Sequence, residues 1–533
     1  MSIKSSWAAR GMVVAPHSLA AQSGLAVLRE GGNALEAMVA AAATISVVYP
    51  HMNGIGGDSF WLIHEPGKDV TTIDACGRAA GRATIAFYRQ HKVDAIPMRG
   101  PLAANTVAGT ISGWALALDY SKKNWAGRLP LARLLDDATH HADHGIVVTQ
   151  SQFANTRAKL AELKDVPGFS TRFLVDGKVP AAGSLMKQPA LAATMRQLAK
   201  YGLADFYEGE LARSIAGDLA TLGSPLVLAD FDGHSAELRA PVMLKHSVGS
   251  IYNMAPPTQG TASLMILGIL DRLELGSVSP DSADYVHLCV EATKQAFLVR
   301  DRHITDPAFM TVAPQQLLEP QGLDQLAAAI ERDAALPWGA QSKRGDTVWM
   351  GAIDRAGRAV SFIQSIYHEF GSGVVLKGSG VNWQNRGCSF SLDERALNAL
   401  KPRRKPFHTL NPALARLNDG RTVVYGTMGG EGQPQTQAAV FTRYAVYGQG
   451  MQQAISAPRW LLGRTWGQAT DTLKLEARFE PALVKELKRR GHDVEMLQAL
   501  DETVGHAGGI ARHANGVLEA GYDPRSDGAA AGF

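Results

Sequence analysis

The sequence predicts layers of helices and strands, with a mainly antiparallel β core and helices on the outside. The first observation is a pair of strands rich in β-branched and aromatic residues, 347–353 and 358–366, joined by the turn 354–357. The second is a further strand, 421–428, that ends in Gly429-Gly430. The third is that segments with helical spacing flank these strands along the chain. Strands joined by a short turn pair in antiparallel fashion, which sets the expected core.

The chain opens with two helices in succession. Ser18 can cap a first helix that ends at Gly31-Gly32, a typical C-terminal signal. Asn33 then caps a second helix, and Glu36, three residues later, completes a capping box. The body of that helix, 37–48, is almost entirely small and apolar, which predicts burial on most of its faces.

Further elements follow in the first two thirds of the chain. A glycine-rich turn over 51–58 leads into a strand over 60–64. Helical spacing then predicts helices over 131–144, 190–201 and 281–302.

The composition excludes several classes of protein. The chain has 533 residues, a length that would allow three or four domains. Its formal charge is only +3, which argues against a nucleic-acid partner or a polybasic membrane-surface protein. Hydrophobic residues make up 46% of the chain, so a large core is available and disorder is excluded.

The cysteines and the apolar runs point to one compartment. Cys76, Cys289 and Cys388 are widely spaced, with no CxxC motif, which fits free thiols and excludes a thiolate zinc cage. No secretory signal is apparent at the N-terminus. The longest apolar run, 37–49, is shorter than the roughly 20 residues that a membrane span needs. We therefore expect a cytoplasmic protein that does not enter a membrane.

A polar segment rich in small residues, 338–345, is the best candidate for an exposed, cleavable linker. It delivers Thr347 to the first position of a strand. If the Asp346–Thr347 bond is cut, Thr347 carries both a hydroxyl nucleophile and a free α-amino group. The pKa of such an amine is about 8, which suits a general base near neutral pH. The alternative is an ordinary threonine that begins a strand.

The strand that ends in Gly429-Gly430 presents successive backbone N–H groups at a sharp turn. Such donors can stabilise the oxyanion of a tetrahedral intermediate, or they can hold a phosphate. The chain has neither a Gly-Lys-Ser/Thr sequence nor the glycine spacing of a dinucleotide site, and a plain turn is the remaining alternative. His140 and His144 could present a metal-binding face, but no second ligand cluster accompanies them, so we expect no metal site.

These pieces together resemble the γ-glutamyltranspeptidase family of N-terminal nucleophile hydrolases. The resemblance covers nearly the whole chain and keeps the order and spacing of the motifs. It implies an α+β fold, a four-layer αββα sandwich that forms one compact catalytic unit. Its motifs are REGGNALEAMVAAA (29–42), MNGIGGDSF (52–60), NTVAGTISGW (105–114), APPTQG (255–260), EATKQAFLVRDRHITDP (291–307), FGSG (370–373) and DPRSDGAAAG (523–532).

The family's precursor cuts itself immediately before a catalytic threonine, and Thr347 stands at that position. The resemblance therefore implies a large chain, 1–346, and a small chain, 347–533, that stay together as an αβ heterodimer, with a higher oligomer left open. Ser365 falls where the family has a hydroxyl residue that supports the nucleophile. Gly429-Gly430 matches the family's oxyanion glycines. No metal or organic cofactor is implied.

The substrate pocket departs from the pattern of the γ-glutamyl enzymes. Those enzymes hold the α-carboxylate of the substrate with an arginine, and the gap-free alignment places Cys76 there, with Arg78 two residues on. They hold the α-amino group with a glutamine and an aspartate, and these positions become Arg386 and Ser389. The acidic partner of an ammonium group is thus replaced, and a cation stands in the pocket.

The remaining departures concern size. A Ser-Ser pair at the α-carboxylate becomes His408-Thr409, and an asparagine near the nucleophile becomes Tyr367. Because Arg386 would repel an ammonium and is suited to bidentate carboxylate binding, we expect an acid without an α-amino group, held also by His408 or Thr409. Bulky Tyr367 and His408 favour a small acid. The resemblance is closer to a branch of the family that hydrolyses such a small anionic amide in the bacterial salvage of purine nitrogen.

Three alternatives stay open at this point. The first alternative is that the chain is a γ-glutamyl hydrolase or transferase, or a glutaryl-type acylase, of the same fold. The second is that it is an unprocessed, non-enzymatic binding protein that keeps the pocket. The third is that Arg78 binds the substrate carboxylate in place of Arg386.

Overall fold

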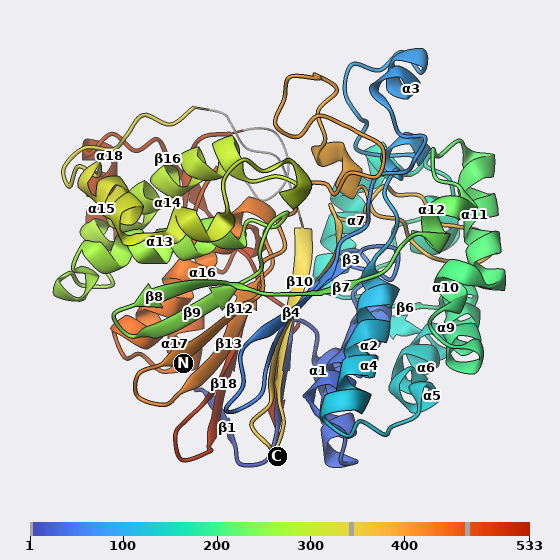
Figure 1. The fold of residues 1–533 in the computed structure, drawn as a ribbon, viewed down its shortest axis with the longest axis horizontal. Helices are drawn as coiled ribbons and strands as arrows, with labels where there is room; N and C mark the ends of the chain where they lie inside the picture. Colours follow the sequence, from blue (N-terminus) through green and yellow to red (C-terminus); the bar gives the residue numbers. More distant parts are fainter. Residues whose placement is uncertain (1–3, 340–345, 464–469) are drawn as a thin grey trace.

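Two seven-stranded sheets face each other in the computed structural model, which describes residues 4–339, 346–463 and 470–533 (Figure 1). Every neighbouring pair of strands in these two sheets is antiparallel. The first sheet contains, in order, β19 (Ala529–Gly532), β2 (Met12–Ala15), β10 (Asp346–Ile353), β11 (Ala359–Tyr367), β3 (Asp58–His64), β4 (Thr71–Ala75) and β7 (Glu237–Arg239). The second contains β1 (Ser6–Ala8), β18 (Leu518–Tyr522), β17 (Ala507–Arg512), β13 (Thr422–Thr427), β12 (Ala413–Leu417), β9 (Gly249–Asn253) and β8 (Val242–His246).

Helices cover the outer face of each sheet (Figure 1). On the first sheet lie α1 (Ser18–Arg29), α2 (Ala34–Val48) and α4 (Thr110–Asn124), with α6 (Asp136–His144) and α9 (Pro189–Tyr201) beyond them. On the second lie α13 (Gly260–Arg272), α14 (Ala283–His303), α16 (Gln433–Phe441), α17 (Met451–Ser456) and α18 (Pro481–Arg489). The predicted four-layer αββα sandwich is confirmed.

Smaller elements complete the described chain. The remaining helices are α3 (Ile85–Gln90), α5 (Leu131–Leu134), α7 (Gln150–Leu163), α8 (Phe169–Phe173), α10 (Asp205–Glu208), α11 (Glu210–Leu222), α12 (Leu228–Asp232) and α15 (Pro320–Ala328). Two small sheets contain β5 (Ile146–Val147) with β6 (Leu185–Met186), and β14 (Trp460–Leu462) with β15 (Leu473–Glu476) and β16 (Val494–Leu497). No helix among the described residues combines the length and the apolar character that crossing a bilayer requires.

The opening helix pair forms much as its caps predict. Asn33 Oδ1 accepts from the backbone N–H of Leu35 and Glu36, and the Glu36 carboxylate accepts from Asn33 N, so the capping box is confirmed. Every residue of α2 is buried, as its composition predicts. The predicted cap Ser18 is wrong: His17 caps α1, because its Nδ1 accepts from Leu19 N at 3.3 Å, and Ser18 is the first helical residue.

The other local predictions hold with small shifts. The strands predicted over 347–353, 358–366, 421–428 and 60–64 are β10, β11, β13 and β3. The helices predicted over 190–201 and 281–302 are α9 and α14, whereas 131–144 is divided into α5 and α6 at Leu135. Most of the predicted linker, 338–345, lies outside the described residues, which resume at Asp346.

A close contact across the two sheets provides a stability test. A Cβ added at Gly426 in β13 would lie 2.2 Å from Cδ1 of Trp349 in β10, and the indole is held because its Nε1 donates to Ser361 Oγ at 2.9 Å. We therefore expect Gly426→Ala to lower the free energy of unfolding by about 1–3 kcal/mol in chemical denaturation. The control Gly217→Ala, on the exposed face of α11, should raise it by roughly 0.5–1 kcal/mol, because its Cβ meets nothing within 4 Å. Equal stability of the two variants would contradict this packing.

Candidate active site

Thr347 lies at a β-bulge near the start of β10. Asp346 is opposite Tyr367 and Val348 is opposite Gln364, so the single residue Thr347 faces two residues of β11. The extra residue of the bulge is in β11, so the regular pairing of the two strands is interrupted opposite Thr347. Thr347 is fully buried. The bulge therefore singles out the residue that the sequence predicts to be the nucleophile.

The side chain of Gln433 contacts the Thr347 hydroxyl. Gln433 Nε2 donates to Thr347 Oγ1 at 3.3 Å, and Gln433 Oε1 accepts from Asn411 N at 3.3 Å, which orients the amide. Gln433 begins α16, immediately after the glycine turn 429–432. The contact therefore places this turn close to Thr347. Sequence reasoning missed Gln433, because the only signal was its nearness to the glycines.

The turn after β13 requires its two glycines. Gly429 has φ 120° and Gly430 has φ 50°, a region of backbone conformation that side-chain-bearing residues rarely adopt. Gln259 Nε2 donates to Gly430 O at 2.7 Å, and Arg300 binds both Gln259 Oε1 (3.0 Å) and the Glu431 carboxylate (3.1 Å). This buried network fixes the direction of the backbone at the two glycines. Rigid N–H groups of this kind can stabilise an oxyanion.

Ser365 shapes the other side of the bulge. Its side chain is buried, and its Oγ accepts from Tyr367 N at 2.8 Å. Tyr367 has φ +81°, an unusual value for a residue with a side chain. The Ser365 hydroxyl therefore holds the backbone at the end of β11, where Tyr367 lies.

Arg386 is buried beside Tyr367, and the described residues supply it with no anionic partner. Its Cζ lies 3.3 Å from the centroid of the Tyr367 ring, and its Nη1 donates to Thr409 Oγ1 at 3.2 Å. Only 1% of Arg386 is exposed, and its Nε and Nη2 have no hydrogen-bond partner among the described residues. A buried cation in this state is costly unless an anion pairs with it. The described part of the chain thus leaves a place for a carboxylate.

Two contacts connect Arg386 to the rest of the site. Tyr367, under the guanidinium, is the residue opposite Asp346 in the β10–β11 hairpin. Thr409, which Arg386 binds, offers its backbone oxygen to Gln259 Nε2 at 2.9 Å, and the same amide nitrogen binds Gly430. The structure therefore brings together Thr347, the glycine turn and Arg386, which lie far apart in the sequence.

His408 is held by a buried carboxylate. Its Nδ1 accepts from Leu410 N at 3.4 Å, so its Nε2 carries the proton and donates to Asp58 Oδ2 at 3.1 Å. Burial lowers the pKa of His408 to about 4, so the ring is neutral at physiological pH. Sequence reasoning missed Asp58. Its other oxygen accepts from three donors: Gly77 N (2.9 Å), Gly109 N (3.0 Å) and Gln384 Nε2 (3.1 Å).

Cys76 lies against this pair. The ligating atoms of Cys76, Asp58 and His408 are within 4.8 Å of one another, and all three residues are buried. Burial and the two carboxylates of Asp58 and Asp74 raise the pKa of the Cys76 thiol well above its usual value. A divalent ion could bind here only if His408 gave up its hydrogen bond to Asp58. The thiol is therefore neutral and fills space next to Arg386, where the γ-glutamyl enzymes are expected to carry an arginine.

The other predicted residues lie as follows. Ser389 is buried and its hydroxyl donates to Phe407 O at 3.3 Å. Arg78 is well exposed, 3.5 Å from the Glu237 carboxylate, and it donates to Arg403 O. Arg78 thus has an anionic partner of its own, whereas Arg386 has none among the described residues.

A second group of metal-ligating side chains combines two residues of α14 with one residue that follows α18. His287, Glu291 and His492 have their ligating atoms within 4.8 Å of one another. Lys294 Nζ already binds Glu291 at 2.7 Å, so the cation at this carboxylate is an ammonium group. His140 and His144, the predicted solvated helix end, are exposed, and their rings stack with centroids 4.4 Å apart.

Buried histidines predict a loss of stability in acid. Burial lowers the pKa from 6.5 to about 4 in each of four histidines: His64, His234, His408 and His506. Between pH 6.5 and pH 4 the unfolded chain binds more protons than the folded one, so the free energy of unfolding falls as the pH falls. The slope is at most about 1.4 kcal/mol per pH unit for each histidine.

Chemical denaturation across this pH range measures the slope. His64→Gln should make it shallower, because one buried neutral ring is removed, and His144→Gln, at an exposed position, should leave it unchanged. A stability that is constant from pH 6.5 to pH 4 would contradict the prediction.

Comparison with known proteins shows relatives that match nearly the whole chain. The family model described as gamma-glutamyltranspeptidase matches residues 20–533. The chain is 58% identical to the oxamate amidohydrolase proenzyme of Klebsiella pneumoniae subsp. pneumoniae, over 98% of both chains. It is 42% identical to the glutathione hydrolase-like YwrD proenzyme of Bacillus subtilis, again over 98% of both. Among solved structures, the cephalosporin acylase from Bacillus halodurans is similar with a TM-score of 0.91 and 32% identity, covering 100% of this chain and 97% of that one.

Proposed function

This chain belongs to the gamma-glutamyltranspeptidase family, and on that premise we propose that it hydrolyses oxamate to oxalate and ammonia. The observation that carries the proposal is Arg386, a buried guanidinium with no anionic partner among the described residues. Oxamate is a small amide whose carboxylate is bonded directly to the amide carbon. Its carboxylate can pair with the guanidinium of Arg386. It has no amino group, and an ammonium group would be repelled by the same guanidinium.

The mechanism begins with cleavage of the Asp346–Thr347 bond. In the unbroken chain the nitrogen of Thr347 belongs to a peptide bond and cannot act as a base. Cleavage converts it into an α-amine, and gives a large chain, 1–346, and a small chain, 347–533. The two chains stay together as an αβ heterodimer, since β10 of the small chain pairs with β2 of the large one.

Amide hydrolysis then proceeds in two steps. Thr347 Oγ1 attacks the amide carbon while the α-amine takes the hydroxyl proton, and this proton passes to the departing ammonia. The N–H groups of Gly429 and Gly430 stabilise the oxyanion. Water, activated by the same amine, hydrolyses the acyl ester and releases oxalate and the free hydroxyl. Ser365 holds the bulge that presents Thr347, and no metal is needed for any step.

The substrate is selected by charge and by size. Arg386 binds the carboxylate together with Thr409, which already accepts from the guanidinium. Tyr367 and His408 limit the length of the acid, because both side chains are buried and Asp58 holds the imidazole in place. Ser389 lies in the same short 3-10 helix as Arg386, Arg386–Ser389.

A panel of amides tests the substrate. The processed protein is assayed for ammonia released from oxamate, from neutral oxamide and from L-glutamine, and for glutamate released from glutathione. We expect kcat/KM to be highest for oxamate. A preference for glutamine or glutathione would favour a γ-glutamyl enzyme. This is the second candidate function, and the 42% identical glutathione hydrolase-like relative supports it. A glutaryl amide in the same panel tests for a glutaryl-type acylase. A single unprocessed band with no hydrolysis would favour a binding protein.

We propose that the reaction takes place in the cytoplasm as part of purine catabolism. All three cysteines are free thiols, which suits a cytoplasmic location. Oxamate hydrolysis would release nitrogen as ammonia, which suits a step in purine catabolism.

A further inference from the structure

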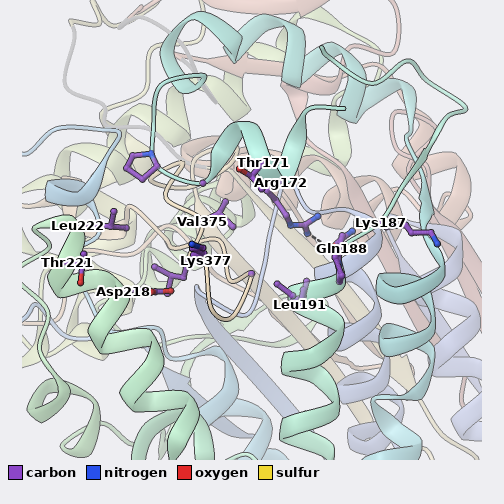
Figure 2. Close-up of a pocket in the computed structure, with 16 residues that line it drawn as sticks. Thr171, Arg172, Lys187, Gln188, Leu191, Asp218, Thr221, Leu222, Val375 and Lys377 are labelled. Atoms are coloured by element: carbon purple, nitrogen blue, oxygen red, sulfur yellow. Dashed lines mark hydrogen bonds between the residues drawn. The ribbon is translucent and has the colours of Figure 1, made fainter. Parts of the chain in front are cut away.

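A separate cavity lies between α8, α9, α11 and the loop 375–380. Its volume is about 500 Å³, within the range of small-molecule sites. Figure 2 shows α8 and Arg172 above it, Gln188 and Leu191 on one side, and Asp218, Thr221 and Leu222 on the opposite side. Its lining includes neither Thr347 nor any residue that we place around Thr347.

The cavity contains a cation, Arg172, for which the described residues supply no counter-ion. Arg172, in α8, points toward Gln188 and donates to its Oε1 from Nη2 (Figure 2). Gln188 is itself fixed, because its Nε2 donates to Val47 O at 2.8 Å. The Nε and Nη1 of Arg172 are buried and have no hydrogen-bond partner within the described ranges. Burial with no neighbouring anion lowers the pKa of Arg172, a sign that its charge is poorly solvated.

The remaining charges of the lining are two lysines and one aspartate. Lys187 and Lys377 line it and are exposed to solvent. Asp218 is the one acidic residue of the lining, and its carboxylate accepts from Gly378 N at 2.9 Å. The lining therefore has an excess of two positive charges, and its buried donors are those of Arg172.

The rest of the lining is largely apolar and includes Pro189, Leu191, Leu222, Val375 and Leu376. A bare inorganic anion would satisfy Arg172 and leave these side chains uncovered. We propose that the cavity binds a small organic acid, whose carboxylate pairs with Arg172 and whose apolar body lies against Leu191, Leu222 and Val375. The site is distinct from the candidate active site.

A purely structural role for Arg172 makes a different prediction. An arginine retained for stability would have its guanidinium paired, and its loss would destabilise the fold. An unpaired buried cation instead costs stability in the empty protein. We therefore expect Arg172→Met, which keeps an apolar stem, to leave the melting temperature of the ligand-free protein unchanged or higher.

The test uses the whole processed protein with octanoate as the probe. Isothermal titration calorimetry compares octanoate with octan-1-ol, which has the same body without charge, and with inorganic phosphate, which has charge without a body. We expect saturable binding of octanoate at a stoichiometry of one per chain pair. Octan-1-ol and phosphate should bind more weakly by roughly tenfold or more, since each lacks one of the two contacts. Arg172→Gln should weaken octanoate binding to the same extent.

Arg157→Gln is the matched control, because Arg157 lies nearby on α7 and is exposed outside the cavity. It should bind octanoate like the unmodified protein. Equal affinity for octanoate and octan-1-ol, phosphate binding as tight as that of octanoate, or octanoate binding that is insensitive to Arg172→Gln would each overturn the proposal. So would the absence of saturable binding, or a lower melting temperature of Arg172→Met. No amide substrate is used, so the outcome is independent of the proposed catalytic activity.

Discussion

Replacing Thr347 by alanine is expected to abolish both chain cleavage and amide hydrolysis. The variant lacks the hydroxyl that attacks, and its uncut chain lacks the α-amine that would serve as the base. We expect a single full-length band on a denaturing gel, with no fragments 1–346 and 347–533. Ammonia release from oxamate should fall by about four orders of magnitude or more, the typical cost of removing a catalytic nucleophile.

Two further variants separate this role from a general effect on the fold. Thr347→Ser keeps a hydroxyl and should still be processed, with reduced activity. Thr422→Ala, at the start of β13 and partly exposed, should be processed and active like the parent. Amide hydrolysis that survives in a correctly folded Thr347→Ala protein would remove Thr347 from the mechanism.

Replacing Arg386 by glutamine is expected to reduce kcat/KM for oxamate roughly 10- to 150-fold, mainly through KM. This corresponds to the loss of a hydrogen bond to a charged group, about 1.5–3 kcal/mol. We expect this loss because two buried nitrogens of Arg386 have no partner among the described residues and can bind the carboxylate of the substrate. Steady-state kinetics with oxamate and with neutral oxamide measure the effect, and the preference for oxamate should fall by a similar factor.

A merely structural Arg386 would behave differently. It stacks on Tyr367 and binds Thr409, so its loss would then reduce the rates with oxamate and oxamide alike. Arg386→Lys should recover part of the affinity for oxamate, because it restores the charge without the planar fork. Arg395→Gln, an exposed arginine of the same region, should leave KM unchanged. An unchanged preference for oxamate in Arg386→Gln would take this residue out of substrate binding.

Much of the candidate site could be predicted because its signals are local. Thr347 follows a polar segment and begins a strand, and Gly429-Gly430 ends one, and the resemblance to the family gives these local signals their expected roles. Arg386 was singled out because it replaces the residue that the γ-glutamyl enzymes carry at the same position of a recognisable loop. Arg78 could not be set aside on the same grounds, because only the structure shows its partner, Glu237.

Other members of the site had no sequence signal that identified their partners. Gln433 binds Thr347 from 86 positions away, and Asp58 binds His408 from 350 positions away. No periodicity or motif relates such pairs, since the contact exists only after two sheets and their loops have packed. The same holds for Arg172, whose lack of an anion depends on which side chains the fold brings near it.

The sequence by itself determined the helices, the strands and the family. Helix caps, strand alternation and turn residues act over a few positions along the chain, because the interactions that they make are local. Asn33 with Glu36 and the hairpin 346–367 are examples. Only the tertiary structure decided which charges are paired and which are buried alone. The reason is physical: the free energy of a buried charge depends on the partners within a few ångströms, and chain folding alone chooses those partners. That choice paired Arg78 with Glu237 and left Arg386 with no anionic partner among the described residues.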